Sequence, residues 1–255
     1  MRNIWVIFQK ELNSYFMSPI AYVVLGIFSV AFGWFFWNSV AAFNYYGLQA
    51  QMSGQAIPMS INEQLIRPLL SNVAVVGLLV IPFISMRLFA EEKRTGTIEL
   101  LATSPVRDVE VILGKWLAAT SLYAITLLYS GVSMALLFRY GNPDWKPLLT
   151  GYLGLLLQAA GMLAVGTFIS TLTRHQIIAV ALTFCVCLML FILGWATSYE
   201  TATWAKVLDY LSVNAHFDSF SKGVLDSKDA IYYVSLIFLG LFLTSRSMES
   251  LRWRS

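Results

Sequence analysis

The chain has 255 residues, of which 58% are hydrophobic and only 12% are charged. Soluble domains have about 25% charged residues, so this composition excludes an ordinary soluble protein and indicates one embedded in a membrane. The formal net charge of +3 is too small to suggest a nucleic-acid-binding protein. At about 20 apolar residues per helical span, the sequence predicts about six spans and leaves no room for a soluble domain of normal size.

Residues 1–17 predict an amphipathic helix lying at the membrane interface. Large apolar side chains recur on one helical arc, and Gln9, Lys10 and Asn13 lie opposite. Glu11 falls on the apolar side, where a carboxylate needs a donor or a cation. We expect it to pair with the basic residues of a later charged segment; the alternative is that it reaches the lipid headgroups. The first apolar run after this helix is long and aromatic, so we expect no cleavable signal peptide.

Six apolar segments predict the membrane spans of an all-α integral membrane protein. They cover residues 20–43, 68–86, 111–138, 148–172, 177–195 and 230–244. Residues 44–63 contain Gly47, Gly54 and Pro58 and predict an extramembrane loop. In the second span Pro82 removes a backbone hydrogen bond and predicts a kink just before the charged segment.

Two kinds of small residue occur within the later spans. Cys185 and Cys187 are interpreted as small buried hydrophobic residues, because neither His175 nor His216 is near them in the sequence to complete a metal site. The fourth span is rich in glycines, which allow close helix contact in lipid: Gly151, Gly154, Gly161 and Gly166.

Residues 87–115 form the one long charged segment between two strongly apolar ones. Ionised side chains at the bilayer centre each cost several kcal/mol, so this segment must lie outside the hydrocarbon. With the N-terminus inside, eleven of the 17 Lys and Arg residues fall on the inner side and the other six on the outer side. This excess predicts that both termini and the charged segment are cytoplasmic.

Within the charged segment, residues 95–104 predict a short amphipathic helix. Thr95 can cap a helix and Gly96 relaxes the backbone at its start, while Pro105 stops it about two turns later. Ser104, with Pro105 at the first helical position, or Asp108 could cap the third span in turn. A solvated charged loop is the alternative, but the segment has dense charges of both signs, an apolar middle and helix signals at both ends. An exposed apolar face on such a helix needs a protein partner or the membrane surface.

The sequence AEEKRTGTIELLATSPVRDVEVILGK resembles the cytoplasmic region of type-2 ABC transporter permeases. Their pattern is roughly E-x-x-x-G-T-x-E-x-L-x-x-x-P, followed by a helix that contains G-K. The matching positions here are Glu92, Gly96, Thr97, Glu99, Leu101, Pro105, Gly114 and Lys115. The opening QKELNSYFMSPIAYV and the closing HFDSFSKGVLDSKDAIYYVSLIFLGLFLTSRSMESLRWR look like the branch that includes the gliding-motility permease and the permease for nitrous-oxide-reductase maturation.

The resemblance covers nearly the whole chain and implies a six-helix half-transporter. Residues 1–17 would be its elbow helix, with Glu11 as the pairing residue, and residues 95–104 its coupling helix, seated in a groove of a separate ABC ATPase. Short external or re-entrant helices are implied over about residues 214–226. There Phe217, Phe220 and Val224 would present an apolar face to the outer membrane surface or a lateral gate, together with His216. The residues implied for coupling are Glu91, Glu92, Arg94, Gly96, Thr97, Ile98, Glu99, Leu100 and Leu101.

The resemblance also implies the partners and the location. It implies two ATPase copies that bind ATP and Mg, a second copy of this chain, membrane lipid and a periplasmic or extracellular accessory protein, but no nucleic acid. It implies an exporter in the cytoplasmic (inner) membrane of a prokaryote, with no cofactor and no catalytic residue on this chain. A Walker A loop is excluded by the residues themselves, since Val109 holds the first glycine position before Gly114-Lys115 and Trp116 follows the lysine.

Two rival functions remain open from the sequence. The first is an intramembrane hydrolase that uses Glu91 and Glu92; against it, Gly96 stands where the arginine of such a signature belongs. The second is a channel or structural membrane subunit that does not pump, and it fits the lack of an obvious ionisable residue at mid-depth in the spans.

Overall fold

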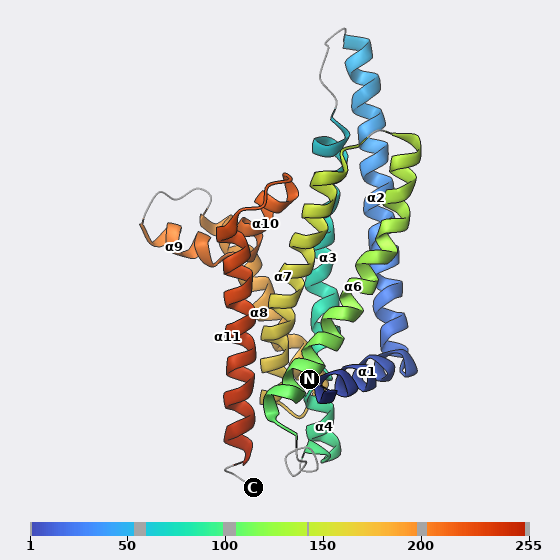
Figure 1. Ribbon diagram of the computed structural model, residues 1–255. Coiled ribbons are helices and arrows are strands. Elements are labelled where there is room, and N and C mark those ends of the chain that lie inside the picture. The colour runs from blue at the N-terminus through green and yellow to red at the C-terminus, as the bar shows by residue number, and fades with distance from the viewer. Residues whose placement is uncertain (1, 54–59, 99–105, 142, 198–202, 253–255) are drawn as a thin grey trace.

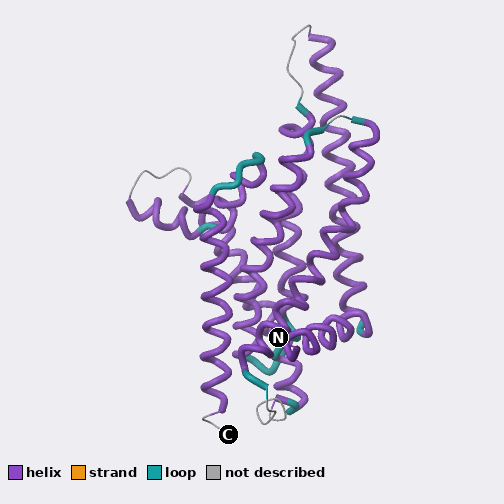
Figure 2. The backbone as a smooth tube through the Cα atoms, viewed as in Figure 1, coloured by secondary structure: helices purple, strands orange, loops and turns teal. Residues whose placement is uncertain are grey.

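The computed structural model describes residues 2–53, 60–98, 106–141, 143–197 and 203–252, and the regular structure of these residues is helical throughout, with no strand (Figures 1 and 2). Six of the described helices are long and apolar enough to cross a membrane. They are α2 (Pro19–Ser53), α3 (Arg67–Ser85), α6 (Asp108–Tyr140), α7 (Trp145–Leu172), α8 (Gln176–Thr197) and α11 (Ser227–Arg252). The predicted fold class, an all-α membrane protein with six spans, is confirmed.

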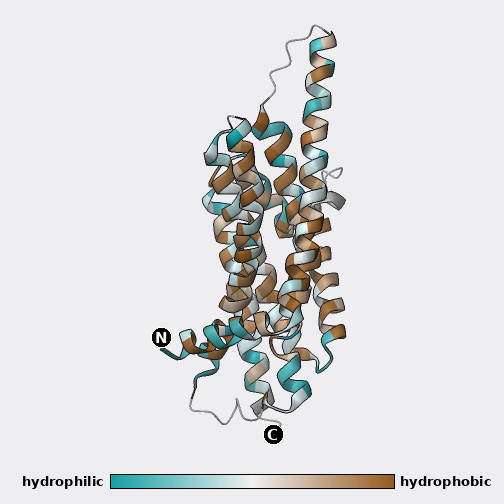
Figure 3. Ribbon diagram, turned by 90° about the vertical axis from the view of Figure 1, so that its right-hand side faces the viewer, coloured by the Kyte–Doolittle hydropathy of each residue, from teal (hydrophilic) through white to brown (hydrophobic). Residues whose placement is uncertain are grey.

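The remaining elements are short and lie at the two ends of the bundle. They are α1 (Arg2–Met17), the π-helical turn η1 (Asn62–Ile66), α4 (Ala90–Thr95), α9 (Thr203–Leu211) and α10 (Val213–Ser221). α1 lies across the foot of the bundle, at the same end as α4 and the C-terminus, while α9 and α10 lie toward the other end (Figure 1). Hydrophobic residues dominate the middle of the bundle and hydrophilic ones gather toward its ends (Figure 3).

The bundle is packed around α7. Each of the four glycines expected to allow close contact sits where a methyl group would collide with a neighbouring helix. The neighbours are Leu70 of α3 at Gly151, Phe220 of α10 at Gly154, Leu236 of α11 at Gly161, and Ser85 of α3 at Gly166. α7 can therefore contact three elements at distances that larger side chains would prevent.

α2 is longer than the sequence predicted. It has 35 residues and continues to Ser53, through part of the expected loop. A single glycine such as Gly47 costs a helix only about 1 kcal/mol, which a long helix tolerates. At 1.5 Å per residue α2 is about 52 Å long, against about 30 Å of hydrocarbon, so its last turns extend beyond the membrane.

α3 continues through Pro82 and ends at Ser85. The interruption of the helix therefore falls after the proline, between Ser85 and Ala90, and not at the proline itself. α3 and α4 are thus separate helices joined by a short turn. The site described next is built on this turn.

Candidate functional site

The turn between α3 and α4 is held by a serine of α7. The hydroxyl of Ser170 accepts hydrogen bonds from the backbone N–H groups of Phe89 (3.1 Å) and Ala90 (3.0 Å), and it donates one to the carbonyl of Met86 (3.1 Å). These three bonds use the full capacity of a hydroxyl group. The position of α4 is therefore set by α7 as well as by its own chain connection.

Gly96 ends α4. Its φ of 75° and ψ of 0° lie in the left-handed region, which favours glycine and commonly terminates helices. In the last turn the Thr95 hydroxyl donates to the carbonyl of Glu91 at 3.0 Å. The expectation that Thr95 and Gly96 begin a helix is wrong, because they close the preceding one. Ile98 is helical again and packs against the core. Glu99, Leu100 and Leu101 lie outside the described residues, so a coupling helix over the remaining part of the predicted range, residues 98–104, stays a prediction.

The end of α4 is open to solvent. Arg94, Thr95, Gly96 and Thr97 are all exposed, and we call residues 94–97 the α4 tip. The tip lies at the end of the bundle that also holds α1 and the C-terminus (Figure 1). A partner protein could therefore reach these four residues without any rearrangement of the bundle.

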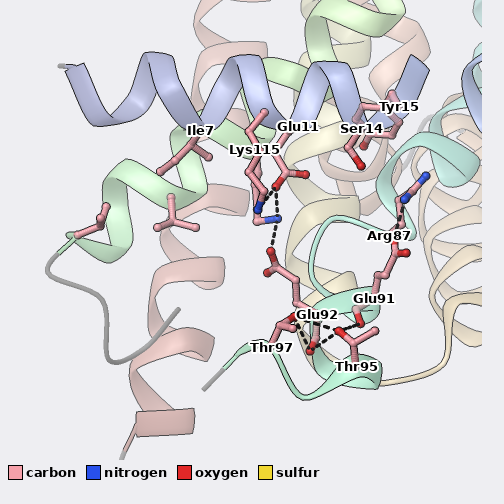
Figure 4. Close-up of a pocket in the computed structure, with 13 residues that line it drawn as sticks. Ile7, Glu11, Ser14, Tyr15, Arg87, Glu91, Glu92, Thr95, Thr97 and Lys115 are labelled. Carbon is pink, nitrogen blue, oxygen red and sulfur yellow. Dashed lines mark hydrogen bonds and ion pairs between the residues drawn. The ribbon is translucent and has the colours of Figure 1, made fainter. Parts of the chain in front are cut away.

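A buried lysine joins α4 to α1 through two carboxylates. Lys115 of α6 is only 2% exposed, and its Nζ lies 2.9 Å from Glu11 Oε1 and 2.8 Å from Glu92 Oε1 (Figure 4). The ring of Phe89 lies below the ammonium group, with its centroid 5.3 Å from Nζ. Each carboxylate side chain is 14% exposed, so little water is available to replace the lysine. This arrangement gives Glu11 the cation that its position on the apolar side of α1 requires.

The residue before this lysine explains how α1 comes so close. A methyl group at Gly114 would lie 2.8 Å from Ile7 Cγ2 and 3.1 Å from the Ile4 carbonyl oxygen, so α1 crosses α6 directly over the glycine. Near the start of α6, Asn3 Nδ2 donates to Glu110 Oε2 at 3.0 Å. Gly114 therefore allows α1 to pack directly on α6, and Lys115 pairs with Glu11 of α1. This Gly-Lys pair is not part of a phosphate-binding loop.

The start of α6 differs from the prediction in one detail. Arg107 is the residue before the helix, in extended conformation, and Asp108 is the first helical residue and not the cap. The backbone N–H of Arg107 donates to Glu110 Oε2 at 3.4 Å. An acidic first turn suits the positive end of the helix dipole.

A second ion pair links the α3–α4 turn to the junction of α1 and α2. Arg87 Nε lies 2.7 Å from Glu91 Oε2, and Arg87 Nη1 donates to Ser18 Oγ at 2.6 Å. Tyr15 is buried beside this pair and its hydroxyl donates to the Ile84 carbonyl at 2.7 Å. Burial, with the nearby carboxylate of Glu11, raises the pKa of Tyr15, so the hydroxyl stays a donor at any physiological pH.

A third contact runs from α4 to the end of α7. The ammonium group of Lys93 donates to the Thr171 carbonyl, one of the carbonyls left without a partner at a helix C-terminus. The Thr171 hydroxyl donates in turn to Ser247 Oγ of α11 at 2.7 Å. α4 is therefore connected to α1, α6, α7 and, through α7, to α11.

Between α1 and α4 lies a cavity of about 530 Å³. It is lined by both ion pairs, and Glu92 Oε2 is buried at its edge without a hydrogen-bond partner in the described part of the chain. Figure 4 shows Lys115 between Glu11 and Glu92, with Arg87 and Glu91 on the other side of the cavity. The predicted coupling residues Glu91 and Glu92 thus both hold α4 in place, while Arg94, Gly96 and Thr97 form the α4 tip.

Two of the three residues predicted to form an outward apolar face are buried. Phe217 and Phe220 are each 1% exposed and pack against α7 at Gly154. Val224 is exposed but follows α10 and is not part of its helical face. The expectation that these three side chains share one outward apolar face is wrong, since glycine in α7 lets the two phenylalanines enter the core.

His216 belongs to a buried polar cluster. Its Nδ1 lies 2.7 Å from Asp229 Oδ1, its Nε2 lies 2.9 Å from the Tyr210 carbonyl, and its ring stacks on Tyr232 with 3.9 Å between centroids. A carbonyl only accepts, so Nε2 carries a proton. A second proton must then lie between Nδ1 and Asp229, because two bare acceptors would repel each other at 2.7 Å. This pair ties α10 to the first turn of α11.

A more exposed cluster lies nearby. Arg67 Nη2 is 2.5 Å from Asp218 Oδ1, and Lys222 contacts the other carboxylate oxygen. Partial burial alone would raise the pKa of Asp218, but the hydrogen bonds from Lys222 and Arg67 outweigh it and lower that pKa. Asp218 is therefore ionised at neutral pH and links α3 to α10.

The arrangement disfavours the rival hydrolase. Glu91 and Glu92 are each engaged in an ion pair, Glu91 with Arg87 and Glu92 with Lys115, so neither is a free carboxylate that could activate water. Within the described residues, no group of three His, Cys, Asp or Glu side chains is placed to hold a metal ion. Cys187 is buried and Cys185 is exposed on α8, so only one of the two cysteines occupies the expected buried position.

Sequence reasoning missed three residues of these networks. A lysine inside an apolar helix is a signal for a paired charge, and applying this rule to Lys115 would have identified the partner of Glu11. Ser170 gives no such signal, because serine is common in transmembrane helices and its three backbone contacts depend on how α3 turns. Asp229 lies 13 residues from His216 in the chain, and only the fold brings the two side chains together.

Residues 5–243 match the family described as ABC-2 family transporter protein. No curated protein matches the chain. The matched range extends from α1 into α11 and includes both ion pairs around the cavity, Ser170 and the α4 tip.

Proposed function

The chain belongs to the ABC-2 family of transporter proteins, and on this premise we propose that the α4 tip is the point at which a separate ABC ATPase acts on it. The family is one of membrane permease subunits that are not themselves catalytic, and membership implies a partnership with an ABC ATPase. The protein is accordingly a multi-pass membrane subunit of an ABC transporter.

One observation carries the proposal: the exposed tip is attached to a helix that is fixed on all its other sides. α4 is held by Lys115 and Glu92 toward α1 and α6, by Arg87 and Glu91 toward the α1–α2 junction, and by Ser170 toward α7. A displacement of the tip would therefore move α4 together with the adjoining ends of α1, α2, α6 and α7. A loop without such side-chain contacts would change its own conformation instead and would leave the helices in place.

The proposed mechanism is alternating access. ATP and Mg bind to the partner ATPase, and closure of an ATPase dimer displaces the coupling segment, residues 95–104. The Ser85–Ala90 turn then acts as the hinge through which α3 and α7 change their tilt. Two copies of this chain would form the path between them. The charge asymmetry of the sequence supports cytoplasmic termini. Export across a prokaryotic inner membrane, with an accessory protein on the far side, is proposed from the family resemblance alone.

A pair of glycines allows the proposal to be tested with a matched control. Gly96 and Gly223 both have positive φ, 75° and 87°, but lie in different parts of the chain, Gly223 directly after α10. Gly96→Trp adds bulk at the tip and Gly96→Ala adds only backbone strain. Gly223→Ala adds backbone strain away from the tip together with a tight contact to Pro147 at 3.1 Å, so it is the harsher change and a stringent control. Each variant would be purified from native membranes, and the amount of copurified ATPase and its ATP hydrolysis in proteoliposomes would be measured.

We expect Gly96→Trp to lose most of the ATPase, or to leave its hydrolysis independent of the permease, while Gly223→Ala keeps both. Glu99→Arg should behave like Gly96→Trp if residues 98–104 form the docking helix. Normal ATPase recovery and stimulation with both Gly96→Trp and Glu99→Arg would show that the ATPase docks elsewhere.

A further inference from the structure

His216 of α10 links three helices through one imidazole ring, at the end of the bundle opposite α1 (Figure 1). Its Nδ1 lies 2.7 Å from Asp229 Oδ1 of α11, and its Nε2 lies 2.9 Å from the carbonyl oxygen of Tyr210 in α9. The ring stacks on Tyr232 of α11. The side chains of His216 and Asp229 are only 8% and 10% exposed, so water does not readily replace either contact. The link to α9 and the link to α11 therefore depend on the same side chain.

The number of protons on this side chain decides how many of the two links can exist. A backbone carbonyl only accepts, so the contact with Tyr210 requires a proton on Nε2. An ionised carboxylate also only accepts, so the contact with Asp229 requires a second proton between Nδ1 and Oδ1. A neutral imidazole beside an ionised carboxylate has one proton for two acceptors. Removal of one proton from the pair therefore breaks one of the two links.

The link to α9 is the one that a lost proton breaks. A hydrogen bond from Nδ1 to the charged carboxylate of Asp229 is roughly twice as strong as one from Nε2 to a neutral carbonyl. The other tautomer would leave a bare Nδ1 only 2.7 Å from a charged oxygen, where two acceptors repel each other. The remaining proton therefore stays on Nδ1, and the Tyr210 carbonyl loses its donor.

α9 depends on this bond because it is short. It has nine residues, Thr203–Leu211, and an isolated helix of this length is marginal in water. Among the described residues, two side-chain hydrogen bonds hold its C-terminal end: the one from His216 and one from the Tyr232 hydroxyl to the Leu211 carbonyl at 2.7 Å. Along its length α9 packs on α8. Loss of the His216 bond would remove one of the two bonds and should loosen the helix.

The titratable side chains that face the imidazole come from α9 and α11. In the described part of the chain they are Asp229, Tyr232 and Tyr233 of α11 and Tyr210 of α9. The hydroxyl groups of Tyr232 and Tyr233 donate to the carbonyls of residues 211 and 213, so neither tyrosine supplies a proton to the pair. Asp229 is thus the one acidic partner among these four side chains.

The titratable groups on the other elements around α10 have different partners or lie apart. Arg67 of α3 and Lys222, directly after α10, both pair with Asp218. Tyr152 of α7 bonds to a serine of α6, and the two cysteines of α8 lie in the middle of that helix. The charged side chains that remain on these elements near α10 are exposed: Lys146, Lys206, Asp209 and Lys228.

We propose that His216 and Asp229 form a pH-sensitive contact: with two protons the pair holds α9 on α10 and α11, and loss of one proton as the pH rises releases the C-terminal end of α9. Histidine is the side chain that ordinarily changes its charge between about pH 5 and pH 8. The end of the bundle opposite α1 would therefore respond to the proton concentration around it. This inference rests on the contacts of α9, α10 and α11 and not on the proposed coupling to an ATPase.

Hydrogen–deuterium exchange of the purified full-length protein tests the proposal. Peptides from α9 and, as an internal reference, from α7 would be followed by mass spectrometry at about pH 5.5 and about pH 8.5. Each rate would be divided by the intrinsic exchange rate at that pH to give a protection factor. Asp229→Asn is the matched control, because its amide can donate to Nδ1 while a neutral His216 keeps its proton on Nε2, so both links survive at either pH.

We expect the protection of α9 in the parent protein to fall several-fold from the lower to the higher pH, while α7 stays unchanged. In Asp229→Asn the protection of α9 should be the same at both values. His216→Gln, whose amide does not titrate, serves as a second control with the same expectation if Asp229→Asn does not fold. Equal protection of α9 in the parent at both pH values would show that the pair does not release a proton. An equal fall in the control variant would show that another group titrates; either result overturns the proposal.

Discussion

Lys115 is the residue on which the packing of α1 and α4 against α6 depends most. It is the common partner of Glu11 and Glu92, and both carboxylates are largely shielded from water. Replacing it with methionine keeps the volume but leaves Glu92 without a cation and Glu11 with only the exposed Lys10, whose Nζ lies 3.7 Å away. Breaking a buried ion pair in this way costs about 3–5 kcal/mol, so we predict that Lys115→Met lowers the Tm of the purified protein by on the order of 10 °C.

A triple variant separates charge from packing in this prediction. Glu11→Gln, Glu92→Gln and Lys115→Met together remove all three charges, and we expect most of the lost stability to return, because an uncharged cluster has no desolvated ion to stabilise. Thermal unfolding followed by circular dichroism measures both proteins. A Lys115→Met variant as stable as the parent would show that the two carboxylates find other partners.

His216 and Asp229 allow a prediction about which of two substitutions lowers the free energy of unfolding more. In Asp229→Asn the side-chain amide can still donate a hydrogen bond to His216 Nδ1, so we expect the free energy of unfolding to fall by less than about 1.5 kcal/mol. His216→Ala leaves the Asp229 carboxylate buried, and its Oδ2 already has no partner in the described residues, so we expect a loss of about 3 kcal/mol or more. Chemical or thermal unfolding of the two purified variants gives the order directly. If Asp229→Asn were the more damaging change, the proton would not be shared as the geometry requires.

At the scale of helices, glycines decide how closely the elements approach. A methyl group at Gly240 of α11 would lie 2.7 Å from a backbone carbon of Ala164 in α7, and a backbone atom cannot turn aside. We predict that Gly240→Ala separates α11 from α7 and costs about 1–3 kcal/mol. Gly131→Ala in α6 is the control, because a methyl group there meets nothing within 4 Å and the alanine should be neutral or stabilising. Equal Tm values for the two alanine variants would contradict the close α7–α11 contact.

The sequence predicted which segments are helices better than where they end. The bilayer requires long apolar segments, so the six spans were visible in the composition. Polar residues beyond the hydrocarbon can stay helical, as α2 does to Ser53, and hydropathy does not detect this. The reverse error occurred at Thr95 and Gly96: a capping residue followed by glycine fits both the start and the end of a helix, and only the left-handed φ of Gly96 shows that it is an end.

At the scale of the whole molecule, the sequence predicted the charged segment as a functional region but not its connections. Glu11 was expected to need a cation because of its place on the apolar arc of α1. That the cation is Lys115, that Glu92 shares it and that Ser170 fixes the turn beside them all depend on contacts between residues far apart in the chain. Such contacts follow from packing, which periodicity within one helix does not determine.

The central claim is that the α4 tip touches an ABC ATPase, and a photo-crosslinker placed there tests it most directly. A benzophenone amino acid would be introduced at Thr97 in the tip and, as the control, at Leu48 on the protruding part of α2; both positions are exposed. After irradiation of native membranes, the cross-linked partners would be identified by mass spectrometry. We predict a cross-link from Thr97 to a protein with a Walker A motif and none from Leu48; no ATPase at Thr97, or the same ATPase at both positions, would contradict the account.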